Sequence, residues 1–86
     1  MIFMKIEETV DLMLSEDRGD RLKAEYWQAK HRVKKLDEYI CKAEAGEPIE
    51  AEDSVEVLKA QGTVMHDYLY YLDMRMKMSG LETEEV

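Results

Sequence analysis

The sequence predicts an all-α fold, in which a short N-terminal helix precedes a long antiparallel two-helix hairpin that assembles as a homo-oligomer. Two stripes of apolar and small residues, each spaced alternately by four and three, predict the long helices. The first stripe comprises Leu22, Tyr26, Ala29, Val33, Leu36, Ile40 and Ala43. The second comprises Val55, Leu58, Gly62, Met65, Leu69, Leu72 and Met76. The third observation is the length of 86 residues, which predicts one small domain over residues 1–80 whose own core is too small for comfortable stability.

Each helix has its own boundary signals. The short helix is expected at about residues 5–14, with Glu7 and Glu8 in its first turn, where the helix dipole favours them. The next is expected at about 16–44, with Ser15 as N-cap and Gly46 as a left-handed terminator before Pro48. The last is expected at about 54–78, because Asp53 and Glu56 form a capping-box pattern and Gly80 follows the periodic residues. Residues 81–86 are expected to be a frayed acidic tail.

An antiparallel pairing of the two stripes gives partners whose numbers sum to about 98. Leu36 then faces Gly62, and the close approach of Leu36 or of a neighbouring chain would compensate for a glycine inside a helix. The last helix also carries apolar residues outside its stripe, more than one partner helix can cover. We therefore expect an oligomer interface formed by Val64, Tyr68, Tyr71 and Met78.

Charge is unevenly distributed along the chain. The net charge is −8, and basic residues outnumber acidic ones only within residues 21–42. Binding of duplex nucleic acid by the whole protein is disfavoured, whereas a small anion bound by the basic helix is possible. The single cysteine, Cys41, excludes an intramolecular disulfide. No secretory signal or apolar run long enough to span a membrane is evident, so the expected location is the cytoplasm, without a membrane partner.

The sequence lacks recognisable catalytic or metal-binding motifs. His31 and His66 lie on different predicted helices without nearby ligands at the spacing that metal sites require. No glycine-rich phosphate loop or nucleophile with a recognisable base is present. We therefore predict a protein that is not an enzyme and needs no metal or cofactor.

One cluster suggests a ligand-binding surface. Trp27, Lys30, His31 and Lys34 lie at i, i+3, i+4 and i+7, on one helical face away from the stripe. An outward tryptophan should stack on a neighbouring subunit or on a flat ligand, and the surrounding cations would suit phosphate. Tyr71 and Arg75 would add a second aromatic and cationic pair. The candidate ligand-binding residues are therefore Trp27, Lys30, His31, Lys34, Tyr71 and Arg75, with burial of Trp27 in an oligomer interface as the alternative.

A spaced pattern of residues carries a family resemblance. It comprises Ser15-Glu16-Asp17, Arg21, Ala24-Glu25-Tyr26-Trp27-Gln28, Arg32, Leu36, Leu58, Gln61, Met65, Tyr68-Leu69, Leu72, Arg75 and Gly80. This pattern, over about residues 13–80, resembles a family of small phage and prophage proteins related to crAss-like phage. The chain departs from that pattern at Met76-Lys77-Met78-Ser79, which replaces a more acidic stretch. The resemblance implies a phage origin, and hence the cytoplasm of a bacterial host, but no particular activity.

The expected layout is also similar to the helical hairpin of viral anti-CBASS and anti-Thoeris sponge proteins. Those proteins oligomerise and sequester cyclic or ADP-ribose-derived nucleotides, although their ligand-binding residues do not align with this chain one by one. The resemblance implies a non-enzymatic sponge for an anionic signalling nucleotide. The alternative is an acidic inhibitor or adaptor that binds a host protein. A concave cavity lined by Trp27 and the Lys30 to Lys35 segment would favour the sponge, and a flat solvated face would favour the adaptor.

Overall fold

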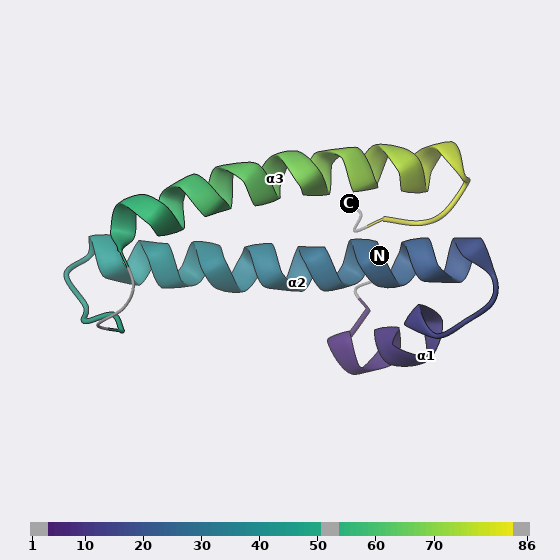
Figure 1. Ribbon diagram of the computed structural model, residues 1–86, viewed down its shortest axis with the longest axis horizontal. Coiled ribbons are helices and arrows are strands. Elements are labelled where there is room, and N and C mark those ends of the chain that lie inside the picture. Colours follow the sequence, from purple (N-terminus) through teal and green to yellow (C-terminus); the bar gives the residue numbers. More distant parts are fainter. Residues whose placement is uncertain (1–3, 51–53, 84–86) are drawn as a thin grey trace.

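The computed structural model describes residues 4–50 and 54–83, and these residues form helices and connecting loops without any strand. A 3-10 helix, η1 (Ile6–Glu8), leads into the short helix α1 (Thr9–Met13). Two long helices follow, α2 (Arg18–Glu44) and α3 (Val55–Met78). Figure 1 shows α3 running antiparallel along one side of α2, with α1 on the other side. The predicted all-α class and the hairpin are therefore confirmed.

Both stripes form the contact between α2 and α3. All fourteen stripe positions are buried or half-buried. The contact is deepest towards the start of α2 and the end of α3. There the core comprises Leu22, Tyr26, Trp27, Ala29, Val33, Leu69, Leu72 and Met76.

Polar pairs connect the two long helices at two levels of the hairpin. Lys59 Nζ lies 2.8 Å from Glu44 Oε2 near the connection, and His66 Nε2 lies 2.9 Å from Asp37 Oδ2 further along. A Cβ atom built on Gly62 would lie 3.7 Å from Leu36 Cδ2. The predicted proximity of Leu36 and Gly62 is therefore confirmed.

The long helix α2 begins two residues later than predicted. Its N-cap is Asp17, whose Oδ2 accepts a hydrogen bond from the Asp20 backbone N at 2.9 Å. The expected N-cap role of Ser15 is wrong, because its hydroxyl instead accepts from the Asp17 backbone N and donates to the Asp20 carboxylate. At the start of α3, Ser54 Oγ accepts from the Val57 backbone N. The capping role predicted for Asp53 lies outside the described residues.

Glycines end both long helices, as predicted. Gly46 and Gly80 have φ values of 96° and 72°, in the left-handed region that glycine adopts without a Cβ clash. The Leu81 backbone N donates to the Met76 carbonyl at 2.9 Å, which completes a Schellman motif. Leu81 also packs against the core. The acidic tail is thus anchored at Leu81 rather than frayed there, and residues 84–86 lie outside the described part.

The N-terminal elements are held to α2 by a buried polar contact. Thr9 is completely buried. Its Oγ1 donates a hydrogen bond to the Ile6 carbonyl at 2.6 Å and accepts one from Gln28 Nε2 at 2.9 Å. The helix predicted at 5–14 is therefore realised as η1 followed by α1. Among the described residues, no helix combines the length and apolar character needed to cross a membrane.

Gly62→Ala should stabilise the protein. The added Cβ would make ordinary van der Waals contacts at 3.5 Å with Ile40 Cδ1 and 3.7 Å with Leu36 Cδ2. Because alanine is favoured over glycine inside a helix by about 1 kcal/mol, the free energy of unfolding should rise by about that amount. Chemical denaturation at fixed protein concentration measures the change. A loss of stability would show that the added methyl group clashes with α2, and therefore that the two helices pack more closely at Gly62 than these distances indicate.

Candidate ligand-binding site

Trp27 is part of the protein's own core. Its side chain is only 2% exposed, and its ring packs edge-on against Tyr26, with centroids 5.0 Å apart. Met4 and Leu81 pack against the same core cluster, so segments from both ends of the described chain cover this region. The prediction that Trp27 faces outward is wrong, because these segments occupy the side of α2 that the hairpin leaves open. In this conformation the ring has almost no exposed surface on which a flat ligand could stack.

His31 also faces the N-terminal segment. Its Nε2 lies 2.6 Å from the Met4 carbonyl oxygen, and this geometry requires the imidazole to donate because a carbonyl only accepts. The imidazole is half-buried. Trp27 and His31 are therefore separated from the open surface that the sequence pattern suggested for them.

Lys30 and Lys34 lie beside a hollow between the long helices. The hollow has a volume of about 380 Å³ and is also lined by Val33, Asp37, Glu38, His66 and Leu69. The side of α2 that carries the predicted lysines is therefore concave rather than flat. Two carboxylates share the lining with the two ammonium groups, so the hollow does not offer a strongly positive environment.

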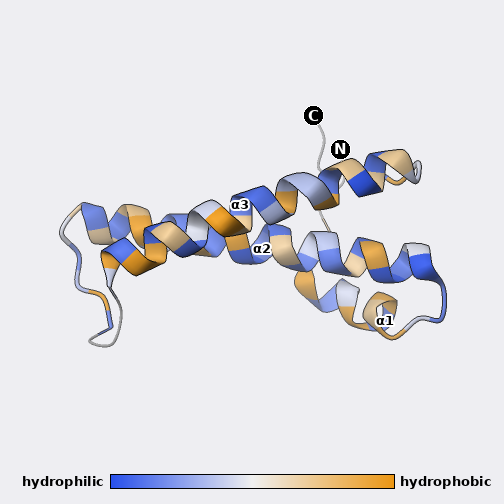
Figure 2. Cartoon of the chain, turned by 45° about the horizontal axis from the view of Figure 1, so that its top comes forward, coloured by the Kyte–Doolittle hydropathy of each residue, from blue (hydrophilic) through white to orange (hydrophobic). Residues whose placement is uncertain are grey.

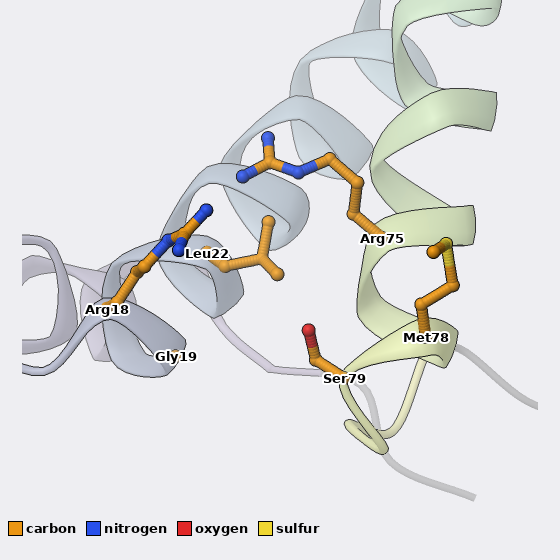
Figure 3. Close-up of a pocket in the computed structure, with 6 residues that line it drawn as sticks. All are labelled: Arg18, Gly19, Leu22, Arg75, Met78 and Ser79. Carbon is orange, nitrogen blue, oxygen red and sulfur yellow. The ribbon is translucent and has the colours of Figure 1, made fainter.

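A second cleft lies at the other end of the hairpin, where α2 begins and α3 ends. We call it the arginine cleft. It has a volume of about 270 Å³ and is lined by Arg18, Gly19, Leu22, Arg75, Met78 and Ser79. In Figure 3, the guanidinium groups of Arg18 and Arg75 lie towards each other beside Leu22, while Met78 and Ser79 project from the end of α3. Its lining contains two cations and no carboxylate.

Glu25 connects the arginine cleft to Tyr68, about two helical turns earlier in α3. Arg75 Nη1 lies 3.9 Å from Glu25 Oε1, and the Tyr68 hydroxyl donates a hydrogen bond to Glu25 Oε2. The Arg18 side chain has no hydrogen-bond or ion-pair partner among residues 4–50 and 54–83. One arginine is thus oriented within the protomer, and the other has its donors available.

Tyr71 lies close to Arg75 in sequence but does not line either hollow. Its ring is 61% exposed and contacts Tyr70 edge-on, with centroids 5.3 Å apart. The six predicted ligand-binding residues therefore divide among three places. Trp27 and His31 lie under the N-terminal segment, Lys30 and Lys34 beside the larger hollow, and Arg75 in the arginine cleft near the exposed Tyr71.

The sequence interpretation missed Arg18 and Ser79. An available signal was the antiparallel register, because partners that sum to about 98 place Arg18 almost level with Ser79 and Gly80. The described residues hold no group of three or more side chains suited to a metal ion. Ionisable groups with altered pKa values lie at the opposite end of the hairpin, where a hydrogen bond to Glu44 raises the pKa of Lys59.

Comparison with protein families gives one assignment. The family model described as Sequestin matches residues 16–78, which include α2 and α3 in full. The chain belongs to the Sequestin family. No curated protein and no solved structure matches the chain.

The extent of the Sequestin match bears on the candidate site. Its boundaries enclose Arg18, Gly19, Leu22, Arg75 and Met78, so the arginine cleft lies almost wholly within the part shared with the family. The Sequestin region also includes the hollow beside Lys30 and Lys34. The segment that covers His31, by contrast, precedes the matched residues.

Proposed function

We propose that this Sequestin-family protein binds and holds a small anionic nucleotide without changing it chemically. The ligand would be a signalling nucleotide of a bacterial immune system, either a cyclic oligonucleotide or an ADP-ribose derivative. The protein would then act as a phage immune-evasion factor in the host cytoplasm. The family name describes sequestration, which agrees with a binding protein rather than a catalyst.

The arginine cleft is the observation that carries this proposal. Arg18 and Arg75 come from different helices and face the same small volume, with the apolar side chain of Leu22 beside them. Guanidinium groups form strong, directional hydrogen bonds with phosphate oxygens. An apolar surface beside such cations suits the sugar or base of a nucleotide. The combination fits an anionic organic ligand better than it fits a free metal ion or a neutral solute.

Self-association through α3 forms the second part of the proposal. We use the term outer face for the exposed apolar residues Val57, Val64, Tyr68, Tyr71 and Met78. In Figure 2, hydrophobic segments recur along α3 between polar ones. When the outer face is reversed end to end about the midpoint between Asp67 and Tyr68, Val64 pairs with Tyr71 and Val57 with Met78. A second antiparallel copy of α3 would therefore match apolar residues with apolar residues, as a two-fold interface requires.

A protein-binding inhibitor or adaptor is the second candidate function. The specific observation in its favour is the same outer face, in which Val64 is 67% and Met78 83% exposed. Exposed apolar surface of this kind commonly marks a protein interaction site. With a net charge of −8, the protein would favour a basic host partner.

A thermal-shift screen against cyclic dinucleotides, cyclic trinucleotides and ADP-ribose derivatives tests the proposed function. A ligand that binds only the folded state at 100 times its Kd adds about 2.7 kcal/mol of stability. For a domain of this size each kcal/mol raises the midpoint by roughly 4–8 °C, so a true ligand should give a large upward shift. If every nucleotide leaves the midpoint unchanged while a basic host protein binds, the second candidate is correct.

A further inference from the structure

We propose that the arginine cleft is a phosphate-binding subsite, in which Arg18 and Arg75 together hold one phosphate or pyrophosphate group of the sequestered ligand. This inference rests on the proposed function and assigns its anion-binding residues. Arg18 lies in the first turn of α2 and Arg75 in the last turn of α3, so the site exists only when the hairpin is closed in its observed register.

The charges within the cleft are incompletely balanced. Glu25 approaches Arg75 at 3.9 Å, which is long for a charge-assisted hydrogen bond, and its other oxygen accepts from Tyr68. Arg18 has no ion-pair or hydrogen-bond partner within residues 4–50 and 54–83. Two cations that face one small volume repel each other. An anion placed between them would be attracted to both and would offset that repulsion. The cleft is therefore suited to an anion before any ligand arrives.

The remaining lining residues suit a phosphate that is attached to an organic group. Ser79 can contribute a hydroxyl donor from the end of α3, while Leu22 and Met78 provide apolar surface. Gly19 leaves space at one wall of the cleft because it has no side chain. A Cβ atom there would lie 3.1 Å from Asp17 Oδ2, the oxygen that caps α2. A larger residue at position 19 would therefore disturb the cap as well as narrow the cleft.

The size of the cleft defines what it can hold. Its volume of about 270 Å³ falls slightly below the usual range for whole small-molecule pockets, about 300–1,000 Å³. It can enclose a phosphate group with an attached sugar, but not an entire cyclic oligonucleotide. The rest of such a ligand would extend beyond the cleft.

The hollow beside Lys30 and Lys34 is less suited to phosphate. Asp37 and Glu38 belong to its lining, and Asp37 is already paired with His66 at 2.9 Å. A phosphate placed there would meet two carboxylates as well as two ammonium groups. We therefore assign phosphate binding to the arginine cleft, and binding at the lysine hollow becomes a competing outcome of the test.

Titration of the protein with inorganic pyrophosphate, followed by backbone amide NMR, tests the inference. We expect the amide resonances of Gly19 and Ser79 to move in a saturable manner. Arg18→Gln should raise the dissociation constant by about tenfold or more, because one charge-assisted contact is lost. Arg18 is the cleaner position to change, since Arg75→Gln would also leave Glu25 without its cationic partner.

Arg32→Gln is the matched control. Arg32 is exposed on the same helix, is absent from the lining of the arginine cleft, and its loss removes the same charge. Arg32→Gln should change the dissociation constant for pyrophosphate by less than about twofold, because its charge lies far from the cleft and is screened. Arg18→Gln, by comparison, should raise it by about tenfold or more. Equal weakening by both variants, or resonance changes centred on Lys30 and Lys34, would overturn the inference, as would the absence of saturable binding at millimolar pyrophosphate.

The nucleotide screen separates this inference from the proposed function. A nucleotide that stabilises the wild-type protein and the Arg18→Gln variant equally would place phosphate binding elsewhere and leave the sponge function standing. A nucleotide that stabilises only proteins with an intact arginine cleft would support both.

Discussion

Replacement of Trp27 by alanine should lower the free energy of unfolding by about 3–5 kcal/mol, the usual cost of truncating a large buried aromatic side chain. Trp27 is 2% exposed and joins the contacts of Tyr26, Met4 and Leu81 into one core. Its loss would leave a cavity where three segments of the chain meet. Denaturant unfolding followed by far-ultraviolet circular dichroism measures the effect.

Tyr70→Ala is the appropriate control for this change. Tyr70 is also aromatic but is 61% exposed on α3, and surface substitutions usually change stability by no more than about 0.5 kcal/mol. If Trp27→Ala were equally mild and instead abolished nucleotide binding, Trp27 would be a ligand platform rather than a core residue. That result would contradict the packing described above.

Val64→Glu should dissociate the proposed homo-oligomer. Val64 lies near the centre of the outer face and is largely exposed in the protomer, so the substitution leaves the hairpin core untouched. In an assembled interface it would bury a carboxylate without a partner, at a cost of several kcal/mol. Sedimentation velocity at micromolar concentration should show an oligomer for the wild type and a folded monomer for the variant.

Thr63→Glu provides the matched control, because it adds the same charge to an exposed neighbouring position outside the outer face. It should leave the assembly intact. Tyr68→Glu would be a poorer choice, since Tyr68 bonds to Glu25 within the protomer and a carboxylate there would repel Glu25 directly. A wild-type protein that remains monomeric at these concentrations would contradict the proposed self-association.

The hairpin could be predicted because its information is local and repeated. Each stripe reports one face of one helix, and Gly46 and Gly80 mark the helix ends through a backbone conformation that glycine favours. The helix start at Arg18 was harder, because Ser15 and Asp17 are both good caps and the choice depends on how they bond to each other and to Asp20. Sequence preference alone does not rank two suitable caps two residues apart.

The environment of Trp27 could not be read from the helix pattern. A position off the hairpin stripe can face solvent, another subunit or a distant part of the same chain. Here Met4 and Leu81, which are far away in sequence, supply the cover. The amphipathic pattern of α2 gives no information about these two residues.

Half of the arginine cleft was accessible to sequence reasoning. Arg75 could be selected as a candidate ligand-binding residue because it follows Tyr71 by one helical turn. Arg18 was not selected, because no aromatic residue lies within one helical turn of it and it becomes significant only when the register brings it opposite the end of α3. Sites built from two distant helix ends require the register to be applied systematically to polar residues as well as to the apolar stripe.

Recovery of the ligand after binding tests the central claim of sequestration most directly. The protein would be incubated with a nucleotide that raises its unfolding midpoint, the free nucleotide would be quantified after filtration, and the protein would then be heat-denatured. We predict that nucleotide disappears from the filtrate in proportion to the protein added and returns on denaturation with its mass and chromatographic retention unchanged. Recovery of an altered product, in amounts that exceed the protein, would contradict the account by showing catalysis instead of sequestration.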